Sequence, residues 1–197
     1  LGGFASAPVV AAASRIGIPV VLLEQNYVPG RATRWLANRA ALVCVSFPET
    51  VSRISRSSGV VVAGNPVRRA IAALADEPRS IDRPDSRRTL LVLGGSQGSR
   101  AVNGAVLALL RQSGEALRDW NVIHQTGAAD FESVRAEYRT LGWSARVEPF
   151  LDDIVECYRS ADLTIARAGG TTLAELACAG CPAVLVPYPG AIGDHQT

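Results

Sequence analysis

The chain has no methionine, only two histidines and four cysteines, and aromatic residues make up 6% of its 197 positions. Because it starts at Leu1 rather than at a methionine, we expect an internal piece of a longer protein. No apolar run reaches the roughly 18 residues that a membrane-spanning helix needs, so no transmembrane segment is expected. Lys and Arg total 20 against 18 Asp and Glu, and this near balance predicts no nucleic-acid partner.

Several catalytic and metal-binding motifs are absent as well. The sequence contains no G-x-S-x-G, H-E-x-x-H or P-loop, and no D-x-D follows an expected strand. Cys178 and Cys181 form a C-x-x-C at the end of an expected helix, without the second pair that a zinc site needs. We interpret them, with Cys44 and Cys157, as core residues, interpret His124 as structural, and expect no metal and no cofactor.

Short apolar runs alternate with helical stretches along the whole chain. Strands are expected at Ile18–Leu23, Ala41–Val45, Val60–Ala63, Thr89–Leu93, Val122–His124, Ala145–Glu148, Leu163–Ala166 and Ala183–Val186, and helices at Pro8–Ile16, Arg31–Asn38, Pro48–Ser57, Val67–Leu74, Ser99–Arg111, Asp130–Leu141, Leu151–Ser160 and Thr171–Ala179. The strands are continuously apolar, which is typical of parallel sheets covered on both faces. This pattern predicts an α/β fold of doubly wound parallel sheets.

A polar, proline-containing stretch at residues 76–88 divides the pattern into two parts. We expect residues 1–70 to belong to one Rossmann-like domain that is truncated at its N-terminus. Residues 71–88 are expected to be a linker, and residues 89–197 a second Rossmann-like domain that is truncated at its C-terminus. Ligands of such sheets bind beyond the carboxyl ends of the strands, so a cleft between the domains is expected.

The stretch at residues 168–176 has the strongest chemical pattern. An apolar strand runs into Gly169-Gly170, two threonines and a helix with Glu175 in its first turns. Glycine allows close backbone approach, and a helix N-terminus offers unpaired N–H groups to phosphate. A carboxylate one turn inside can accept hydrogen bonds from a ribose diol. The alternative is an ordinary strand–turn–helix with a capping threonine and a solvated glutamate.

Two other loops offer partners for phosphate. Gly94-Gly95-Ser96-Gln97-Gly98 opens an expected helix without matching G-x-G-x-x-G, and its N–H groups and the Ser96 hydroxyl could bind phosphate oxygens. Arg68 follows Gly64-Asn65-Pro66 and could pair with a diphosphate, or could be a surface arginine.

Polar loops follow two further strands. Glu24-Gln25-Asn26 is typical of a substrate-facing loop, and His195 in Asp194-His195-Gln196 could be a base or a solvated side chain. Three arginines (Arg31, Arg34 and Arg39) share a helix with Trp35. We interpret this group as a solvated face, with contact to an anionic surface or substrate as the alternative.

Six motifs stand in one order along the chain: Leu1–Pro8, Glu24–Asn26, Gly64–Arg68, Gly94–Gly98, Ala168–Glu175 and Asp194–Gln196. This order resembles the MurG family, the UDP-N-acetylglucosamine:lipid I N-acetylglucosaminyltransferases of peptidoglycan synthesis in glycosyltransferase family 28. The resemblance covers essentially the whole chain and implies the GT-B fold. The family usually has His where this chain has Leu23, and its acceptor-site glycine loop, most of its membrane-docking surface and its last helices fall outside this chain.

The resemblance also implies roles for individual residues. By resemblance, Asn26 and Arg68 contact the donor, Ser96 binds phosphate, Leu151 meets the uracil through its backbone, and Gln196 holds the sugar. The diphosphate and ribose would be held by Gly170, Thr171, Thr172, Leu173, Ala174 and Glu175.

The implied reaction is an inverting, metal-independent transfer of GlcNAc from UDP-GlcNAc to the 4-hydroxyl of MurNAc in lipid I, giving lipid II. Glu24 is a candidate general base, although the family's upstream loop is a better place to look. The implied partners are UDP-GlcNAc, lipid I and, for the full-length protein, the membrane surface at the cytoplasmic face of the bacterial inner membrane. The isolated chain is expected to bind UDP without turnover.

Three alternatives stay open. A UDP-GlcNAc 2-epimerase would share the architecture and need acids near the sugar, where only Glu24 is visible. A non-catalytic nucleotide-sugar-binding half would need a partner chain. An NAD-binding Rossmann domain would prefer NAD over UDP.

Overall fold

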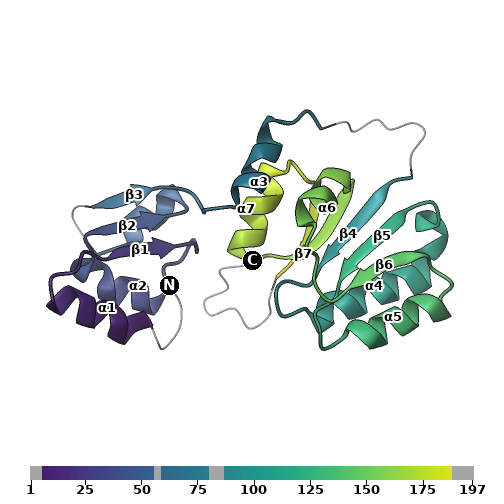
Figure 1. Cartoon of the computed structure of the whole chain (residues 1–197), viewed down its shortest axis with the longest axis horizontal. Helices are drawn as coiled ribbons and strands as arrows, with labels where there is room; N and C mark the ends of the chain where they lie inside the picture. The colour runs from purple at the N-terminus through teal and green to yellow at the C-terminus, as the bar shows by residue number, and fades with distance from the viewer. Residues whose placement is uncertain (1–5, 56–58, 80–86, 188–197) are drawn as a thin grey trace. The chain divides into compact units, whose positions relative to one another are not determined.

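A computed structural model of the chain describes residues 6–55, 59–79 and 87–187 (Figure 1). The contacts divide the chain into two compact units, with the division between Pro66 and Val67. Each unit has its own parallel sheet and its own hydrophobic core.

The first unit contains a three-stranded parallel sheet in the order β1-β2-β3. Its elements are α1 (Ser6–Arg15), β1 (Val21–Glu24), α2 (Arg31–Leu36), the 3₁₀ segment η1 (Ala37–Arg39), β2 (Leu42–Val45), the 3₁₀ segment η2 (Pro48–Arg53) and β3 (Val60–Val62). The core is built on Leu22, Leu36, Val43 and Val45, none of which is exposed. The helix expected at Pro48–Ser57 is instead a shorter 3₁₀ segment, Pro48–Arg53, which begins on the predicted proline.

The second unit contains a five-stranded parallel sheet in the order β6-β5-β4-β7-β8. Its elements are α3 (Arg69–Ala72), the 3₁₀ segment η3 (Ala73–Asp76), β4 (Thr89–Leu93), α4 (Arg100–Ser113), the 3₁₀ segment η4 (Gly114–Leu117), β5 (Asn121–Gln125), α5 (Phe131–Thr140), β6 (Ala145–Glu148), α6 (Ile154–Ser160), β7 (Leu163–Arg167), α7 (Gly170–Cys178) and β8 (Ala183–Val186). In chain order, β5 and β6 extend the sheet on one side of β4, and β7 and β8 then extend it on the other side. The strand order therefore reverses between β4 and β7.

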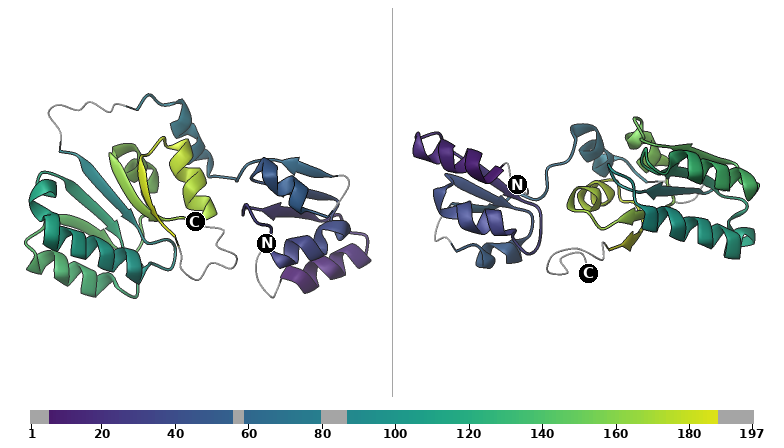
Figure 2. Two further views of the ribbon diagram at one scale, coloured as in Figure 1. Left: turned by 180° about the vertical axis from the view of Figure 1, so that it is seen from behind. Right: turned by 90° about the horizontal axis from the view of Figure 1, so that it is seen from below.

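Helices cover both faces of the second sheet (Figure 2). All five residues of β4 are buried. Leu90 and Val92 pack with residues of α4 and α5, whereas Leu91 and Leu93 pack with residues of α6 and α7. Because successive side chains of a strand point to opposite faces, a continuously apolar strand needs cover on both sides. The predicted parallel, doubly wound α/β architecture is confirmed for this unit.

The boundary between the units differs from the expected linker at residues 71–88. Ile71 has no exposed surface and Leu74 is 6% exposed, and both belong to the core cluster that contains α6 and α7. Glu77 pairs with Arg159 through two contacts of 2.8 Å, and Arg79 donates to the Ala179 carbonyl at 2.9 Å. Residues 67–79 thus belong to the second unit. Polar composition suggested a linker here, but the apolar side chains three positions apart lie on one helical face and are buried.

Candidate functional site

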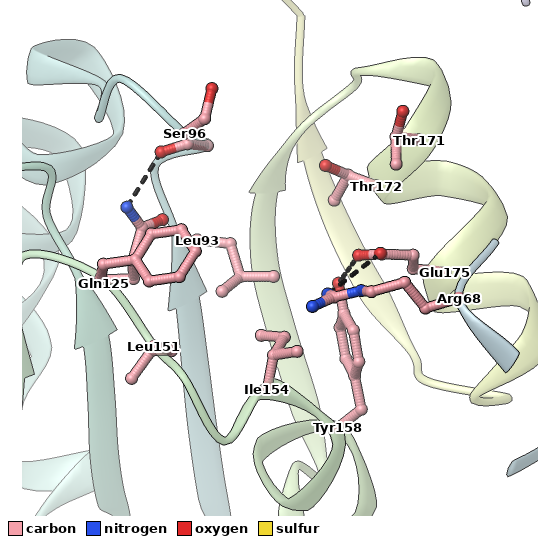
Figure 3. A pocket seen from close by; sticks show the side chains of 12 residues that line it. Arg68, Leu93, Ser96, Gln125, Leu151, Ile154, Tyr158, Thr171, Thr172 and Glu175 are labelled. Carbon is pink, nitrogen blue, oxygen red and sulfur yellow. Dashed lines mark hydrogen bonds and ion pairs between the residues drawn. The ribbon is translucent and has the colours of Figure 1, made fainter. Parts of the chain in front are cut away.

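A cavity of about 360 Å³ opens in the second unit at the carboxyl ends of β4 and β7 (Figure 3). It is lined by Arg68, Leu93, Gly95, Ser96, Gln125, Phe150, Leu151, Ile154, Tyr158, Thr171, Thr172 and Glu175. β4 and β7 are neighbouring parallel strands, with Leu93 paired in register with Ala166. This is the point at which the strand order reverses, where open α/β sheets bind their ligands. The two glycine-containing loops predicted from the sequence therefore meet at one edge of one sheet.

The loop after β4 divides into a part that lines the cavity and a part that packs. Gly95 and Ser96 line the cavity. Gly95 has φ +84° and open space where a Cβ would stand, so its backbone is accessible. A Cβ on Gly94 would lie 2.9 Å from the Ser99 nitrogen, and one on Gly98 would lie 2.8 Å from the Gly127 Cα. Gly94 and Gly98 are thus required by backbone packing.

Of the five residues predicted as a phosphate loop, three do not line the cavity. Gly94 and Gly98 hold the loop against neighbouring backbone, and Gln97 is exposed without lining the cavity. The sequence pattern could not separate these roles, because glycine is favoured both by close ligand approach and by close backbone packing.

The start of α4 is fixed by a side chain that the sequence analysis did not single out. Ser99 Oγ accepts a hydrogen bond from the Val102 N–H at 3.3 Å, as a helix cap does. It also accepts one from Arg167 Nε at 2.8 Å. Arg167 Nη1 donates in turn to the Pro187 carbonyl at 2.8 Å. Arg167 therefore joins the carboxyl ends of β7 and β8 to the loop that follows β4.

The first turn of α7 forms the opposite wall of the cavity. Gly169 is its N-cap with extended backbone (φ −78°, ψ 139°), and the Leu173 N–H donates to the Gly169 carbonyl at 2.9 Å. The N–H groups that precede Leu173 are those that a helix leaves unpaired at its start. Thr171 and Thr172 line the cavity, whereas Gly170, Leu173 and Ala174 belong to the same helix without lining it.

Glu175 lies one turn into α7 and is held by two partners. Arg68 Nη2 donates to Glu175 Oε1 at 3.2 Å, and the Tyr158 hydroxyl donates to Glu175 Oε2 at 3.0 Å (Figure 3). The Glu175 side chain is 12% exposed and that of Arg68 is 59% exposed. The solvated glutamate of the alternative interpretation is therefore wrong, because this carboxylate is largely covered and has a hydrogen-bond partner on each oxygen.

Tyr158 itself is buried in the core cluster between α6 and α7 and is 1% exposed. Burial, followed by the negative charge of Glu175 and the hydrogen bond to it, raises the pKa of Tyr158 above its ordinary value. The hydroxyl consequently keeps its proton and serves as a donor to the carboxylate. No sequence motif indicated this role, since a tyrosine in an amphipathic helix is usually a core residue.

The remaining wall comes from the loop between β6 and α6. Leu151 is 3% exposed and lines the cavity beside Phe150, which is 58% exposed. Gln125, at the end of β5, donates from Nε2 to the Gly95 carbonyl at 2.9 Å and to the Pro149 carbonyl at 3.1 Å. One buried amide thus fixes the distance between the loop after β4 and the loop that carries Phe150.

Two predicted residues, Glu24 and Asn26, belong to the first unit. Glu24 is 4% exposed. Its Oε1 accepts from the Asn26 N–H and from Asn26 Nδ2, both at 3.0 Å, and its Oε2 accepts from the Gly30 N–H at 2.9 Å. The prediction of Glu24 as a general base is not supported by this geometry, because the carboxylate is buried and braces its own loop. Gln196 and His195 lie outside the described residues.

His124 has the structural role predicted for it. It is fully buried, with Tyr138 Oη 3.0 Å from Nδ1 and Asn103 Oδ1 3.0 Å from Nε2. Asn103 Nδ2 donates to the Thr126 carbonyl at 3.1 Å and to Asp130, so Oδ1 is the acceptor and His124 carries its proton on Nε2. Burial lowers the pKa of His124 to about 4. The ring is therefore neutral near pH 7.

In residues 6–55, 59–79 and 87–187, no three His, Cys, Asp or Glu side chains gather closely enough to hold a metal ion. Over the same ranges, none of the helices has the length and apolar character to span a bilayer.

Family models match most of the chain. The glycosyltransferase family 28 C-terminal domain matches residues 89–197, and the glycosyltransferase family 28 N-terminal domain matches residues 1–45.

Two curated relatives carry the name UDP-N-acetylglucosamine–N-acetylmuramyl-(pentapeptide) pyrophosphoryl-undecaprenol N-acetylglucosamine transferase. The one from Nitratidesulfovibrio vulgaris is 48% identical over all of this chain and 53% of its own length. The one from Methylococcus capsulatus is 43% identical over the same shares. The chain thus spans about half the length of the curated relatives it matches.

A solved structure, that of Acinetobacter baumannii MurG, matches the whole chain and 54% of its own chain with a TM-score of 0.74 and 35% sequence identity. The similarity confirms the predicted GT-B fold. It covers both units of the chain, each of which contributes a parallel sheet.

Proposed function

The chain belongs to glycosyltransferase family 28, and we propose that the cavity of its second unit binds the nucleotide of a UDP-N-acetylglucosamine donor. One observation carries this proposal: Ser96, the first turn of α7 and Glu175 line a single cavity at the point where the strand order reverses. The cavity volume of about 360 Å³ lies in the range of small-molecule sites.

The proposed diphosphate site lies between the two loops. Gly95 and Ser96 line the cavity on one side, and Thr171 and Thr172 of the first turn of α7 line it on the other. The donors that these residues carry are backbone N–H groups and the Ser96 hydroxyl. Such groups bind phosphate oxygens well because they are donors fixed by the backbone. Arg68, more than half exposed, is the proposed cationic partner.

The proposed nucleoside site lies on the other side of Glu175. A covered carboxylate suits a ribose diol, since an ionised carboxylate accepts hydrogen bonds and the hydroxyls donate them. The uracil would meet the Leu151 backbone, as the family resemblance implies, and the exposed Phe150 ring offers an apolar face beside it. Gly170, Leu173 and Ala174 would contribute through the α7 backbone. Asn26 and Gln196 stay predictions for contacts to the donor.

For the whole protein, the proposed reaction is an inverting transfer of GlcNAc from UDP-GlcNAc to the 4-hydroxyl of MurNAc in lipid I, which gives lipid II. The hydroxyl oxygen bonds to the anomeric carbon, the bond from that carbon to the diphosphate breaks, and UDP leaves with the electron pair. Fixed N–H donors, Ser96 and Arg68 would stabilise the charge that develops on the diphosphate. A general base has to take the hydroxyl proton; the braced carboxylate of Glu24 does not suit that task.

The proposed acceptor is a lipid, and the name of the relative from Nitratidesulfovibrio vulgaris includes undecaprenol. We therefore place the whole protein, as a proposal, at the cytoplasmic face of the bacterial inner membrane. In the first unit Trp35 is 58% exposed, with the Arg39 guanidinium 4.8 Å from its ring centre. Both interpretations of this basic helix stay open. Weaker sedimentation of a Trp35→Ala variant with anionic vesicles would favour the surface contact.

Calorimetric titration of the chain with UDP, UDP-GlcNAc, UDP-glucose and NAD tests the donor site. We expect the three uridine nucleotides to bind and NAD to bind far more weakly, because the loop after β4 lacks the G-x-G-x-x-G pattern. Equal affinity for NAD and UDP would contradict the proposal and favour the NAD-binding alternative.

The other two alternatives have their own tests. An epimerase would release N-acetylmannosamine from UDP-GlcNAc without a lipid acceptor, but its one visible acid, Glu24, is buried and hydrogen-bonded.

The isolated chain is still expected to lack turnover on lipid I. Measured transfer by this chain alone would overturn that expectation, and it would also remove the case for a non-catalytic half.

A further inference from the structure

The two partners of Glu175 differ in a way that bears on ligand binding. Tyr158 is fixed, since its ring is 1% exposed in the core and its hydroxyl reaches Oε2 at 3.0 Å. Arg68 is less constrained, since its side chain is 59% exposed. It lies at the start of α3, and its Nη2 donates to Glu175 Oε1 at 3.2 Å. One carboxylate oxygen is therefore held by a buried neutral donor and the other by a largely exposed cation.

A ribose diol at this site would need the carboxylate oxygen that Arg68 occupies. Arg68 lines the same cavity as the residues proposed to bind the diphosphate. A diphosphate attracts a guanidinium more strongly than one carboxylate does, because it carries more charge and more acceptor oxygens. Arg68 therefore gains a better partner as the nucleoside diphosphate enters, and Oε1 becomes available to the ribose.

We infer that Tyr158 is a positioning residue that holds Glu175 in the ribose-binding orientation, and that Arg68 blocks this carboxylate until a diphosphate draws it away. This inference rests on the donor site proposed above. It makes ribose recognition depend on the diphosphate, so the site would discriminate against nucleosides that lack phosphates. In this inference Tyr158 acts through Glu175, to which its hydroxyl donates.

The experiment compares three ligands on the 197-residue chain: UDP, 2′,3′-dideoxy-UDP, which lacks the diol, and uridine, which lacks the phosphates. UDP and its dideoxy analogue are titrated calorimetrically, and uridine by ligand-observed NMR. The variants are Tyr158→Phe and Arg68→Gln. Tyr138→Phe is the matched control, because it also removes a buried tyrosine hydroxyl in the same unit, there bonded to His124 at 3.0 Å.

Tyr158→Phe is expected to lower the preference for UDP over the dideoxy analogue by about 3- to 10-fold, while its affinity for the analogue stays near that of the unaltered chain. A merely structural role would weaken both ligands alike. Tyr138→Phe is expected to leave the preference unchanged. Arg68→Gln is expected to weaken UDP by roughly tenfold or more, with uridine binding unchanged or stronger because the block on Oε1 is gone.

Two results would overturn the inference while leaving the donor site intact. One is a preference for the diol in Tyr158→Phe equal to that of Tyr138→Phe. The other is a loss of uridine affinity in Arg68→Gln as large as its loss of UDP affinity. If the unaltered chain bound no UDP, the proposed function would fail first and take this inference with it.

Discussion

At the scale of single residues, Glu175 combines cover with two directed hydrogen bonds. Its side chain is 12% exposed, and each oxygen has one partner from a different helix. A carboxylate in this setting can exchange a partner for a ribose hydroxyl without rearranging the backbone. A substitution that removes the negative charge of Glu175 and keeps its shape therefore tests its contribution to ligand binding.

Glu175→Gln is expected to weaken UDP binding by about 1.5–3 kcal/mol, because a charge-assisted hydrogen bond becomes a neutral one. Calorimetry on the chain measures this loss. Glu137→Gln is the matched control, since Glu137 pairs with Arg111 on α4, away from the cavity. Equal UDP affinity in both variants would remove Glu175 from the site.

His124 gives a residue-scale prediction about pH. Its folded pKa of about 4 lies below the ordinary 6.5, so the unfolded chain binds the proton more readily. The neutral buried ring therefore stabilises the fold fully above pH 6.5. This contribution, about 3 kcal/mol, is lost as the pH falls from 6.5 toward 4.

Urea unfolding of the chain at several pH values in that window measures the effect. A His124→Gln variant is the reference, because the carboxylates that also titrate there are common to both proteins. The unaltered chain should lose stability more steeply than the variant as the pH falls. Parallel curves would show that His124 does not carry this dependence.

At the scale of elements, two loops owe their shape to close backbone contact. Gly98 has φ +76°, and the space for its Cβ is filled by Thr126 and Gly127 of the loop after β5. Gly127 has φ +81°, and its own Cβ position lies 2.8 Å from the Gln97 carbonyl. These loops therefore fit together only with glycine at both positions.

Gly98→Ala is expected to destabilise the second unit by about 1–3 kcal/mol through strain and displaced backbone. Gly104→Ala is the matched control: Gly104 lies within α4 with nothing near its Cβ position, so alanine should stabilise the helix by up to about 1 kcal/mol. Thermal unfolding compares the two. Opposite signs are expected, and a stabilising Gly98→Ala would contradict the packing account.

The loop between β6 and α6 is longer than the sequence pattern predicts. A helix was predicted from Leu151, but α6 begins at Ile154 after its N-cap Asp153. Arg146 of β6 donates to Asp153 at 2.7 and 2.8 Å, which ties the start of α6 to the sheet. Leu151 therefore precedes the helix, and it lines the cavity.

At the scale of the whole molecule, the division between units decides which pieces should fold. The start of the second unit, residues 67–79, supplies Ile71 and Leu74 to its core and Arg68 to its cavity. A piece made of residues 67–197 is expected to bind UDP as the whole chain does. A piece made of residues 89–197 should lose about 3–5 kcal/mol of stability, because two large apolar side chains are no longer buried.

Chemical denaturation and UDP titration of the two pieces test this boundary. The double variant Ile71→Ala and Leu74→Ala in the longer piece separates the lost core from the lost arginine. It should lower stability while leaving the preference for UDP over NAD intact. Equal stability of both pieces would return the boundary to the end of the predicted linker.

By itself, the sequence determined the parallel α/β architecture and the loops at the carboxyl edge of the sheet. Continuous apolar strands, helical periodicity and glycine pairs are local patterns, and local patterns set local structure. Only the tertiary structure decided what Glu175 and Glu24 do. Glu175 meets Tyr158 and Arg68, which are 17 and 107 positions away, whereas Glu24 turns back to its own loop. Contacts across such separations depend on how the helices pack on the sheet, and no residue spacing encodes that.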